Sequence, residues 1–167
     1  MPTKKKNLSE YSPLEIPSSK NMRFGVVVSE WNKEITDALL QGTLTTLKRT
    51  GVLADNIMVI NVPGSFEIPF AAKQLAESTK PDAVICLGCV IQGETRHFDY
   101  ICQGVTQGIT ELNLKYNIPF IFGILTTQNI LQARERAGGT HGNKGVEAAI
   151  TAIKMVDVNR KLQNMGT

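Results

Sequence analysis

The sequence predicts an α/β protein built as a three-layer α/β/α sandwich around one parallel sheet. Short runs rich in Val and Ile alternate with longer segments of helical periodicity, and this unit recurs four times after Met22. The apolar runs show no polar alternation, which is typical of strands that helices cover on both faces. The four strands are expected at residues 23–28, 56–62, 83–90 and 119–125.

The segment before the first strand differs from the rest of the chain. Residues 1–21 contain Pro13, Pro17 and three consecutive lysines, with little periodicity, so they are predicted to form an N-terminal arm. Residues 22–167 then form the one folded domain. The arm is either inert or lies along a neighbouring subunit as an added strand.

Five helices are expected between and after the strands. The first ends at Gly51, a typical C-terminal stop. The second begins near Glu67 and carries Pro69 in its first turn, where the missing N–H is harmless. The other three are expected at residues 95–116, 127–137 and 143–162, with a glycine-rich loop before the last.

Composition and charge restrict the function classes. The net charge of +3 comes mainly from the arm, and residues 22–167 carry 14 basic and 13 acidic side chains. Nucleic-acid binding needs clustered cations, so it is not expected. The longest apolar runs are far shorter than the roughly 20 residues of a membrane span, and the N-terminus has no apolar signal region. These features, with only three cysteines, predict a cytoplasmic protein.

Chemistry is expected in the segments that follow the strands, because ligands of parallel sheets bind beyond the carboxyl ends of the strands. In residues 88–99, GCVIQGETRHFD, Gly93 permits an unusual backbone angle and Glu94 and Thr95 can start a helix. Such a helix N-terminus either receives an anion or is simply capped. His97, in the first turn, is either a proton carrier or a structural residue, and its place favours the first interpretation.

Two other strand ends, and a helix end beside the glycine-rich loop, carry candidate residues. Trp31 either stacks on a planar ligand or packs in the core. In VPGSFEIP, Ser65 does not match a nucleophile elbow, while Glu67 either accepts bonds from ligand hydroxyls or caps a helix. Of Arg134 and Arg136, one is expected to reach a phosphate and the other to be a solvated surface charge. The sequence does not show which is which.

Cofactors and metals find little support in the sequence. No dinucleotide fingerprint or phosphate-binding loop is present, which favours a cofactor-free enzyme. Cys86 and Cys89 have C-x-x-C spacing but lie within an apolar run, and no second pair supplies further zinc ligands. We expect them to be small buried hydrophobic residues, and we expect no metal site.

Four ordered motifs together resemble the lumazine synthase family. They are VPGSFEIP at 62–69, GCVIQGETRHFDYI at 88–101, FGILTT at 122–127 and ARERAGGTHGNKG at 133–145. The resemblance implies a flavodoxin-like fold and the penultimate step of riboflavin biosynthesis. In that step 5-amino-6-(D-ribitylamino)uracil condenses with 3,4-dihydroxy-2-butanone 4-phosphate to 6,7-dimethyl-8-ribityllumazine, phosphate and water, without cofactor or metal.

The resemblance also implies residue roles. His97 matches the acid/base residue, and Glu147 is a candidate to orient it. Glu94 and Thr95 match the phosphate turn, with Arg136 and Lys144 as its cations. The remaining substrate contacts are implied at Trp31, Ser65, Phe66, Glu67, Cys89, Val90, Ile91 and, from the neighbouring subunit, Phe122.

Family members assemble as pentamers with active sites between subunits, and some pentamers form shells of sixty subunits. The compact AGGTHGNKG segment favours a shell, and a functional link to riboflavin synthase is implied. Gln92 and Arg96 depart from common family residues. Two alternatives remain: a shell or ligand-binding protein without activity, and a flavodoxin-like electron carrier, which no independent motif supports.

Overall fold

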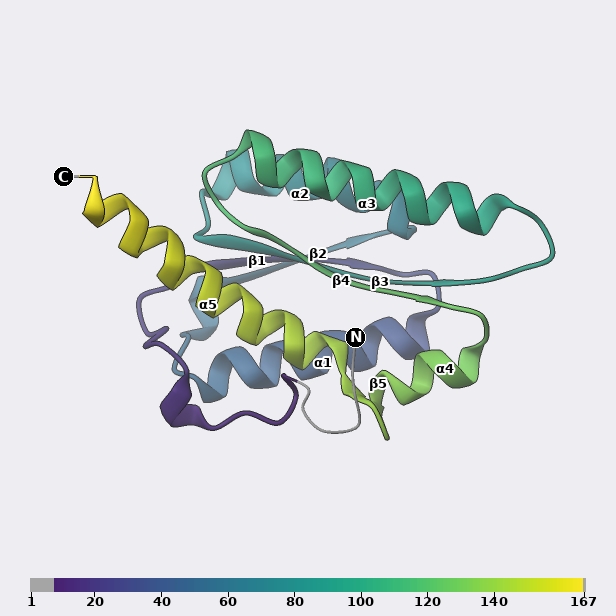
Figure 1. Cartoon of the computed structure of the whole chain (residues 1–167), viewed down its shortest axis with the longest axis horizontal. Coiled ribbons are helices and arrows are strands. Elements are labelled where there is room, and N and C mark those ends of the chain that lie inside the picture. Colours follow the sequence, from purple (N-terminus) through teal and green to yellow (C-terminus); the bar gives the residue numbers. More distant parts are fainter. Residues whose placement is uncertain (1–7, 167) are drawn as a thin grey trace.

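Four parallel strands form the middle layer of the structure, in the order β2-β1-β3-β4 (Figure 1). The computed structural model describes residues 8–166. The predicted α/β class, the three layers and the four-stranded parallel sheet are confirmed. The strands are β1 Phe24–Ser29, β2 Ile57–Val62, β3 Ala83–Ile91 and β4 Phe120–Thr127.

Helices cover both faces of this sheet. Figure 1 shows α1 and α5 on one side of the sheet and α2 and α3 on the other. The long helices are α1 Lys33–Arg49, α2 Ile68–Thr79, α3 His97–Lys115 and α5 Lys144–Met165. The short elements are α4 Ile130–Glu135, β5 Ala137–Gly139, β6 Gly142–Asn143 and 3-10 helices at Pro13–Glu15, Ala54–Asn56 and Ser65–Glu67.

The two apolar layers arise from strand alternation. Successive side chains of a strand point to opposite faces. In β1, Val26 and Val28 therefore pack under α1 and α5, whereas Val27 packs under α2 and α3. All six residues of β1 are buried, as expected of a strand with neighbours on both edges and helices on both faces.

The prediction that every strand is covered on both faces is wrong for β2. Met58 is 46% exposed and Ile60 is 38% exposed. β2 pairs only with β1 and lies at the edge of the sheet, where the helices leave part of its surface open. Apolar composition therefore identified the strand correctly but not its position in the sheet.

The segment after β4 also differs from the prediction. The expected helix at 127–137 is only six residues long, because β4 continues to Thr127 and the Asn129 carboxamide caps α4 by accepting from Gln132 N–H at 2.9 Å. The expected glycine-rich loop forms the antiparallel hairpin β5–β6. Gly138 (φ 116°) and Gly142 (φ 78°) supply the left-handed angles that this hairpin needs.

The described part of the arm, residues 8–21, contacts the layer of α1 and α5. Ser19 is fully buried, and its hydroxyl donates to the carbonyl of Thr50 at 2.7 Å. Ile16 packs against the core on that face. Within residues 8–166 no helix combines the length and the apolar character that crossing a membrane requires.

The connections define where the sheet opens. From β1 the chain crosses to β2 on one side and then returns to β3 on the other. Connections that diverge in this way leave a crevice beyond the carboxyl ends of the two central strands. The turns after β1 and β3 border this crevice.

Candidate active site

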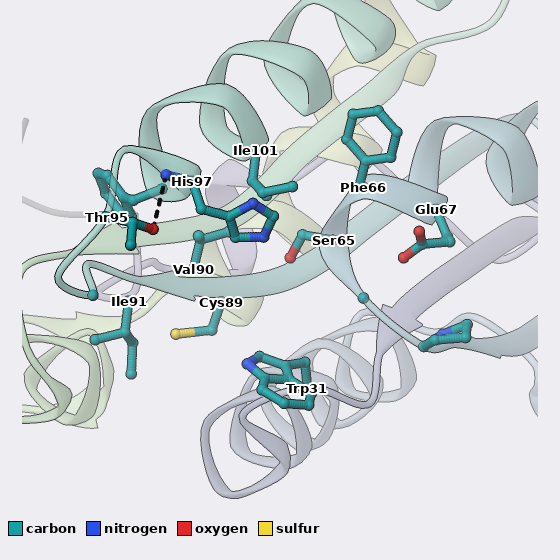
Figure 2. Close-up of a pocket in the computed structure, with 14 residues that line it drawn as sticks. Trp31, Ser65, Phe66, Glu67, Cys89, Val90, Ile91, Thr95, His97 and Ile101 are labelled. Atoms are coloured by element: carbon teal, nitrogen blue, oxygen red, sulfur yellow. Dashed lines mark hydrogen bonds between the residues drawn. The ribbon is translucent and has the colours of Figure 1, made fainter.

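A cleft of about 730 Å³ lies at this point of divergence. Three chain segments form it: the turn after β1, the turn between β2 and α2, and the end of β3 with the start of α3 (Figure 2). It is lined by Trp31, Pro63, Gly64, Ser65, Phe66, Glu67, Cys89, Val90, Ile91, Gly93, Thr95, His97, Phe98 and Ile101. The size suits a small organic molecule.

Trp31 supplies an aromatic surface on one side of the cleft. Its side chain is 73% exposed, so the alternative that it packs in the core is wrong. In Figure 2 the indole lies below Cys89, on the opposite side of the cleft from His97. An exposed ring beside an apolar floor is suited to stacking on a planar ligand.

The turn between β2 and α2 forms a second wall. Ser65 is buried at 5% exposure, yet its hydroxyl has no hydrogen-bond partner within the described residues. Gly88 makes room for it, because a Cβ on Gly88 would lie 2.6 Å from Ser65 Oγ. Phe66 is 55% exposed and Glu67 is exposed, so this turn offers an aromatic face, a hydroxyl and a carboxylate to a ligand.

The floor of the cleft is the end of β3. Cys89, Val90 and Ile91 line it, and all three were predicted to contact substrate. Burial raises the pKa of Cys86 to about 12 and that of Cys89 to about 11. Both thiols are free and buried, which supports their interpretation as small apolar residues and gives neither the low pKa of a reactive cysteine.

The start of α3 forms the third wall. The helix begins at His97, two residues later than expected, and the His97 N–H donates to Thr95 Oγ1 at 3.3 Å. Figure 2 shows the imidazole on the same side of the cleft as Ser65. Free N–H groups and the positive end of the helix dipole make this turn suitable for an anion.

Two predicted features of this turn are not as expected. Gly93 lines the cleft, but its φ lies outside the left-handed region, so another residue could adopt its backbone angle. Glu94 is exposed and does not line the cleft. The turn is therefore shaped by the end of β3 and the start of α3 and does not need an unusual glycine.

Sequence reasoning missed Phe98 and Ile101. Both line the cleft from the first two turns of α3. Ile101 lies four residues after His97 and four before the buried Val105, so the three share one face of the helix. The four-residue spacing along that face could have identified Ile101, because the face continues from Val105 to the cleft.

Three predicted substrate contacts lie elsewhere in the chain. Phe122, in the middle of β4, packs against the core under α2 and α3. Arg136 lines a second cavity of about 430 Å³ beside the β5–β6 hairpin, together with His141. Lys144 begins α5. Within one chain, none of these three side chains lines the cleft of His97.

Arg136, Lys144 and Glu147 form a charged cluster at the start of α5. Arg136 donates from Nη1 and Nη2 to the two Glu147 carboxylate oxygens at 3.0 and 3.2 Å, and Lys144 Nζ lies 3.2 Å from Oε2. Burial raises the pKa of Glu147, but the two cations outweigh burial and hold the pKa below its ordinary value. The carboxylate thus binds these cations within the chain, where the sequence suggested that it orients His97.

The structure also distinguishes the two arginines of the ARER segment. Arg134 pairs with Glu34 at 2.7 Å, and both side chains are more than half exposed. The Arg136 side chain is only 17% exposed. Arg134 is therefore the solvated charge, and Arg136 is the candidate anion ligand.

The fold and the cleft define a class of protein: a small flavodoxin-like α/β enzyme with a ligand-sized site at the divergence of its central strands. Within residues 8–166 no group of three His, Cys, Asp or Glu side chains is placed to hold a metal ion. The model of the 6,7-dimethyl-8-ribityllumazine synthase family matches residues 21–160. The chain belongs to this enzyme family of riboflavin biosynthesis.

Similar proteins with this name cover nearly the whole chain. The protein of Parabacteroides distasonis is 60% identical over 157 residues, which are 94% of this chain and 98% of the relative. That of Porphyromonas gingivalis is 56% identical over 160 residues, 96% of this chain and 99% of the relative. That of Phocaeicola vulgatus is 55% identical over 163 residues, 98% and 97% of the two chains.

Proposed function

We propose that this chain condenses 5-amino-6-(D-ribitylamino)uracil with 3,4-dihydroxy-2-butanone 4-phosphate to 6,7-dimethyl-8-ribityllumazine, releasing phosphate and water. The observation that carries the proposal is the cleft itself. It combines an exposed tryptophan, an unpartnered buried hydroxyl and a histidine at a helix N-terminus, in a chain that belongs to the lumazine synthase family.

The cleft suits the pyrimidine substrate. Its ring stacks on Trp31 over the floor formed by Cys89, Val90 and Ile91. The ribityl hydroxyls and the polar ring edge bind along Ser65, Phe66 and Glu67, where the Ser65 hydroxyl gains the partner that it lacks within the chain.

The phosphate of the second substrate binds at the start of α3. Thr95 and the free N–H groups there meet the anion, with Glu94 contributing backbone of the same turn. Arg136 supplies a bidentate cation and Lys144 a second charge. Because these cations lie away from the cleft of their own chain, they come from a neighbouring copy, as does Phe122.

His97 moves the protons. The 5-amino group attacks the ketone, and His97 accepts the proton that the nitrogen loses and returns it to the carbinolamine oxygen, which leaves as water. Phosphate elimination and ring closure need further proton transfers of the same kind. Binding both substrates side by side removes much of the entropic barrier, so one histidine is sufficient for the remaining chemistry.

The shared site makes the active form a homo-oligomer, which we propose to be a pentamer and, with the compact β5–β6 hairpin, a shell of pentamers. Light scattering of the purified protein tests this assembly. A particle of pentamer mass would contradict the shell, and an active monomer would contradict the shared site. The proposal also includes a cytoplasmic location and a functional link to riboflavin synthase, which consumes the product.

The direct test mixes the two substrates with the purified protein and follows lumazine absorbance. The wild type should form product well above the spontaneous rate. Ser18→Ala, in the exposed part of the arm, is a neutral control. A rate equal to the spontaneous reaction, with riboflavin or a lumazine still bound, would instead identify a ligand-binding protein without activity.

A further inference from the structure

The direction of the Trp31 ring must come from its backbone, because the side chain is 73% exposed and has little core to pack against. One side of its turn is held by β2. The Glu30 N–H donates to the carbonyl of Val62 at 2.8 Å, and the Trp31 N–H donates to that of Pro63 at 3.1 Å. These bonds extend the β1–β2 ladder past the last strand pair, Ser29 and Val62.

The other side of the turn is held by Asn32. Its Nδ2 donates to the carbonyl of Cys89 at 2.8 Å. The ladder between β1 and β3 ends at Val28 and Leu87, so this bond spans the two strands after they have begun to separate. Cys89 is also part of the cleft floor, and Asn32 therefore connects the floor directly to the residue that follows Trp31.

Asn32 adopts a left-handed backbone conformation, which is uncommon in this chain. It has φ 59° and ψ 47°, and among the described residues only one other non-glycine residue, Lys80, has a positive φ. Asn tolerates this left-handed region better than most residues. A left-handed residue immediately after Trp31 turns the chain sharply and fixes where the preceding side chain projects.

The Asn32 side chain does not cap the helix that it precedes. It is the N-cap residue of α1, a position where Asn is favoured because its side chain accepts from the first free N–H groups. Here the side chain makes no cap bond, and the N–H groups of Ile35 and Thr36 donate to the Asn32 backbone carbonyl instead. The carboxamide is thus directed to β3 and away from its own helix.

We propose that Asn32 is a positioning residue that holds the Trp31 ring over the cleft, through its left-handed backbone and its bond to the Cys89 carbonyl. The proposal rests on the proposed function, because Trp31 acquires its role as the stacking surface there. Asn32 itself need not touch substrate.

Trp31 is the only tryptophan in the chain, so intrinsic fluorescence reports on this ring alone. The experiment compares the wild type with Asn32→Ala, which loses both the left-handed preference and the bond, and with Asn32→Gly, which keeps the backbone freedom and loses only the bond. Asn159→Ala is the matched control, because the Asn159 carboxamide also donates to a carbonyl, that of Asn117, at 2.8 Å but away from the cleft.

Both Asn32 variants should lower the fluorescence anisotropy of Trp31 in the free protein, because the ring loses its fixed direction. Acrylamide quenching should increase only slightly, because the side chain is already 73% exposed. The KM for the pyrimidine substrate should rise about tenfold while kcat changes less than about twofold, since the lost interaction is the same in ground state and transition state. Asn159→Ala should match the wild type in all of these measurements.

The outcomes separate this inference from the proposed function. A folded Asn32→Gly protein with wild-type anisotropy and KM would overturn the positioning role and leave the activity standing. An inactive wild type whose Asn32 variants still release the ring would support the positioning role and overturn the proposed function. If Asn32→Ala fails to fold, Asn32→Gly decides, because glycine adopts the required angles without strain.

Discussion

The cleft and the Arg136 cluster differ in how far each satisfies its own polar groups. In the cleft, the buried Ser65 hydroxyl has no partner within the described residues, and Trp31 and Phe66 face solvent. In the cluster, Arg136 and Lys144 are already bound to Glu147. The cleft thus leaves a hydroxyl and two aromatic rings open to a ligand, whereas the cluster pairs its charges within the chain.

Under the proposed function, this difference makes one chain an incomplete site. His97, the proposed proton carrier, and Trp31, the proposed stacking surface, lie together in the cleft, but Arg136 lies in another cavity. Arg136 cannot meet an anion in its own cleft without leaving Glu147. In the proposed assembly a neighbouring copy presents its cluster to the cleft, so the Arg136 side chain does not have to cross from one cavity to the other within a chain.

The largest effect is expected in the cleft. His97→Ala should lower kcat by about 10²- to 10⁴-fold because it removes the proton carrier, with little change in folding since His97 is exposed. His141→Ala is the matched control: the only other histidine lies exposed in the β5–β6 turn beside the cluster. Steady-state kinetics measures both variants, and equal losses would contradict the assignment of proton transfer to the cleft.

Close packing beside the cluster should be sensitive in stability. Gly145 lies where α5 meets α1, and a Cβ there would be 1.9 Å from the carbonyl oxygen of Leu39. Gly145→Ala should therefore lower the free energy of unfolding by about 3 kcal/mol through overpacking. Denaturant unfolding measures it against Gly166→Ala, where a Cβ would lie 3.7 Å from the Gln163 carbonyl oxygen and no loss is expected.

Substitutions of Arg136 and Arg134 compare an ion pair of the cluster with an ion pair on the surface. Arg136→Ala should cost about 2 kcal/mol of unfolding free energy, because buried Glu147 loses two charge-assisted bonds and keeps only Lys144 as a cation. Arg134→Ala removes an exposed pair and should leave stability unchanged. Thermal unfolding of both variants checks the difference, and equal melting temperatures would argue against a structural role for the cluster.

The smallest effect concerns acid stability. The pKa of Glu147 is lower in the folded chain than in the unfolded chain, where it is near the ordinary value of 4.5. Its contribution is therefore fully present above that pH and is lost as the pH falls through the lower, folded pKa. Glu147→Gln should flatten the decline of stability below about pH 4.5 relative to the wild type. An unchanged slope in unfolding titrations would show that the cations do not stabilise this carboxylate.

The sequence predicted most of the sheet and part of the site, for identifiable reasons. Strands such as Phe24–Ser29 carry continuous apolar runs, and a parallel sheet places the residues that follow them at one edge. That rule alone predicts that Trp31, Ser65 and His97 lie at one edge of the sheet, and the structure places all three in one cleft.

What the sequence did not predict depends on tertiary contacts. The exposure of Ile60 follows from the position of β2 at the sheet edge, which apolar composition does not reveal. The bond from Asn32 to Cys89 joins residues 57 positions apart, and its left-handed angle is not visible in a residue that is common at N-caps. The pairing of Arg136 with Glu147 likewise requires the β5–β6 hairpin, which local propensity assigned to a loop.

The central claim is that each site combines the cleft of one chain with the charged cluster of another, and mixing two inactive variants tests it most directly. His97→Ala and Arg136→Ala chains are unfolded together in equal amounts, refolded, and assayed for lumazine formation. If the site is shared, about a quarter of the interfaces join an intact His97 to an intact Arg136, and activity should return to about that fraction of the wild type. No recovery in a mixture that assembles like the wild type would contradict the shared site.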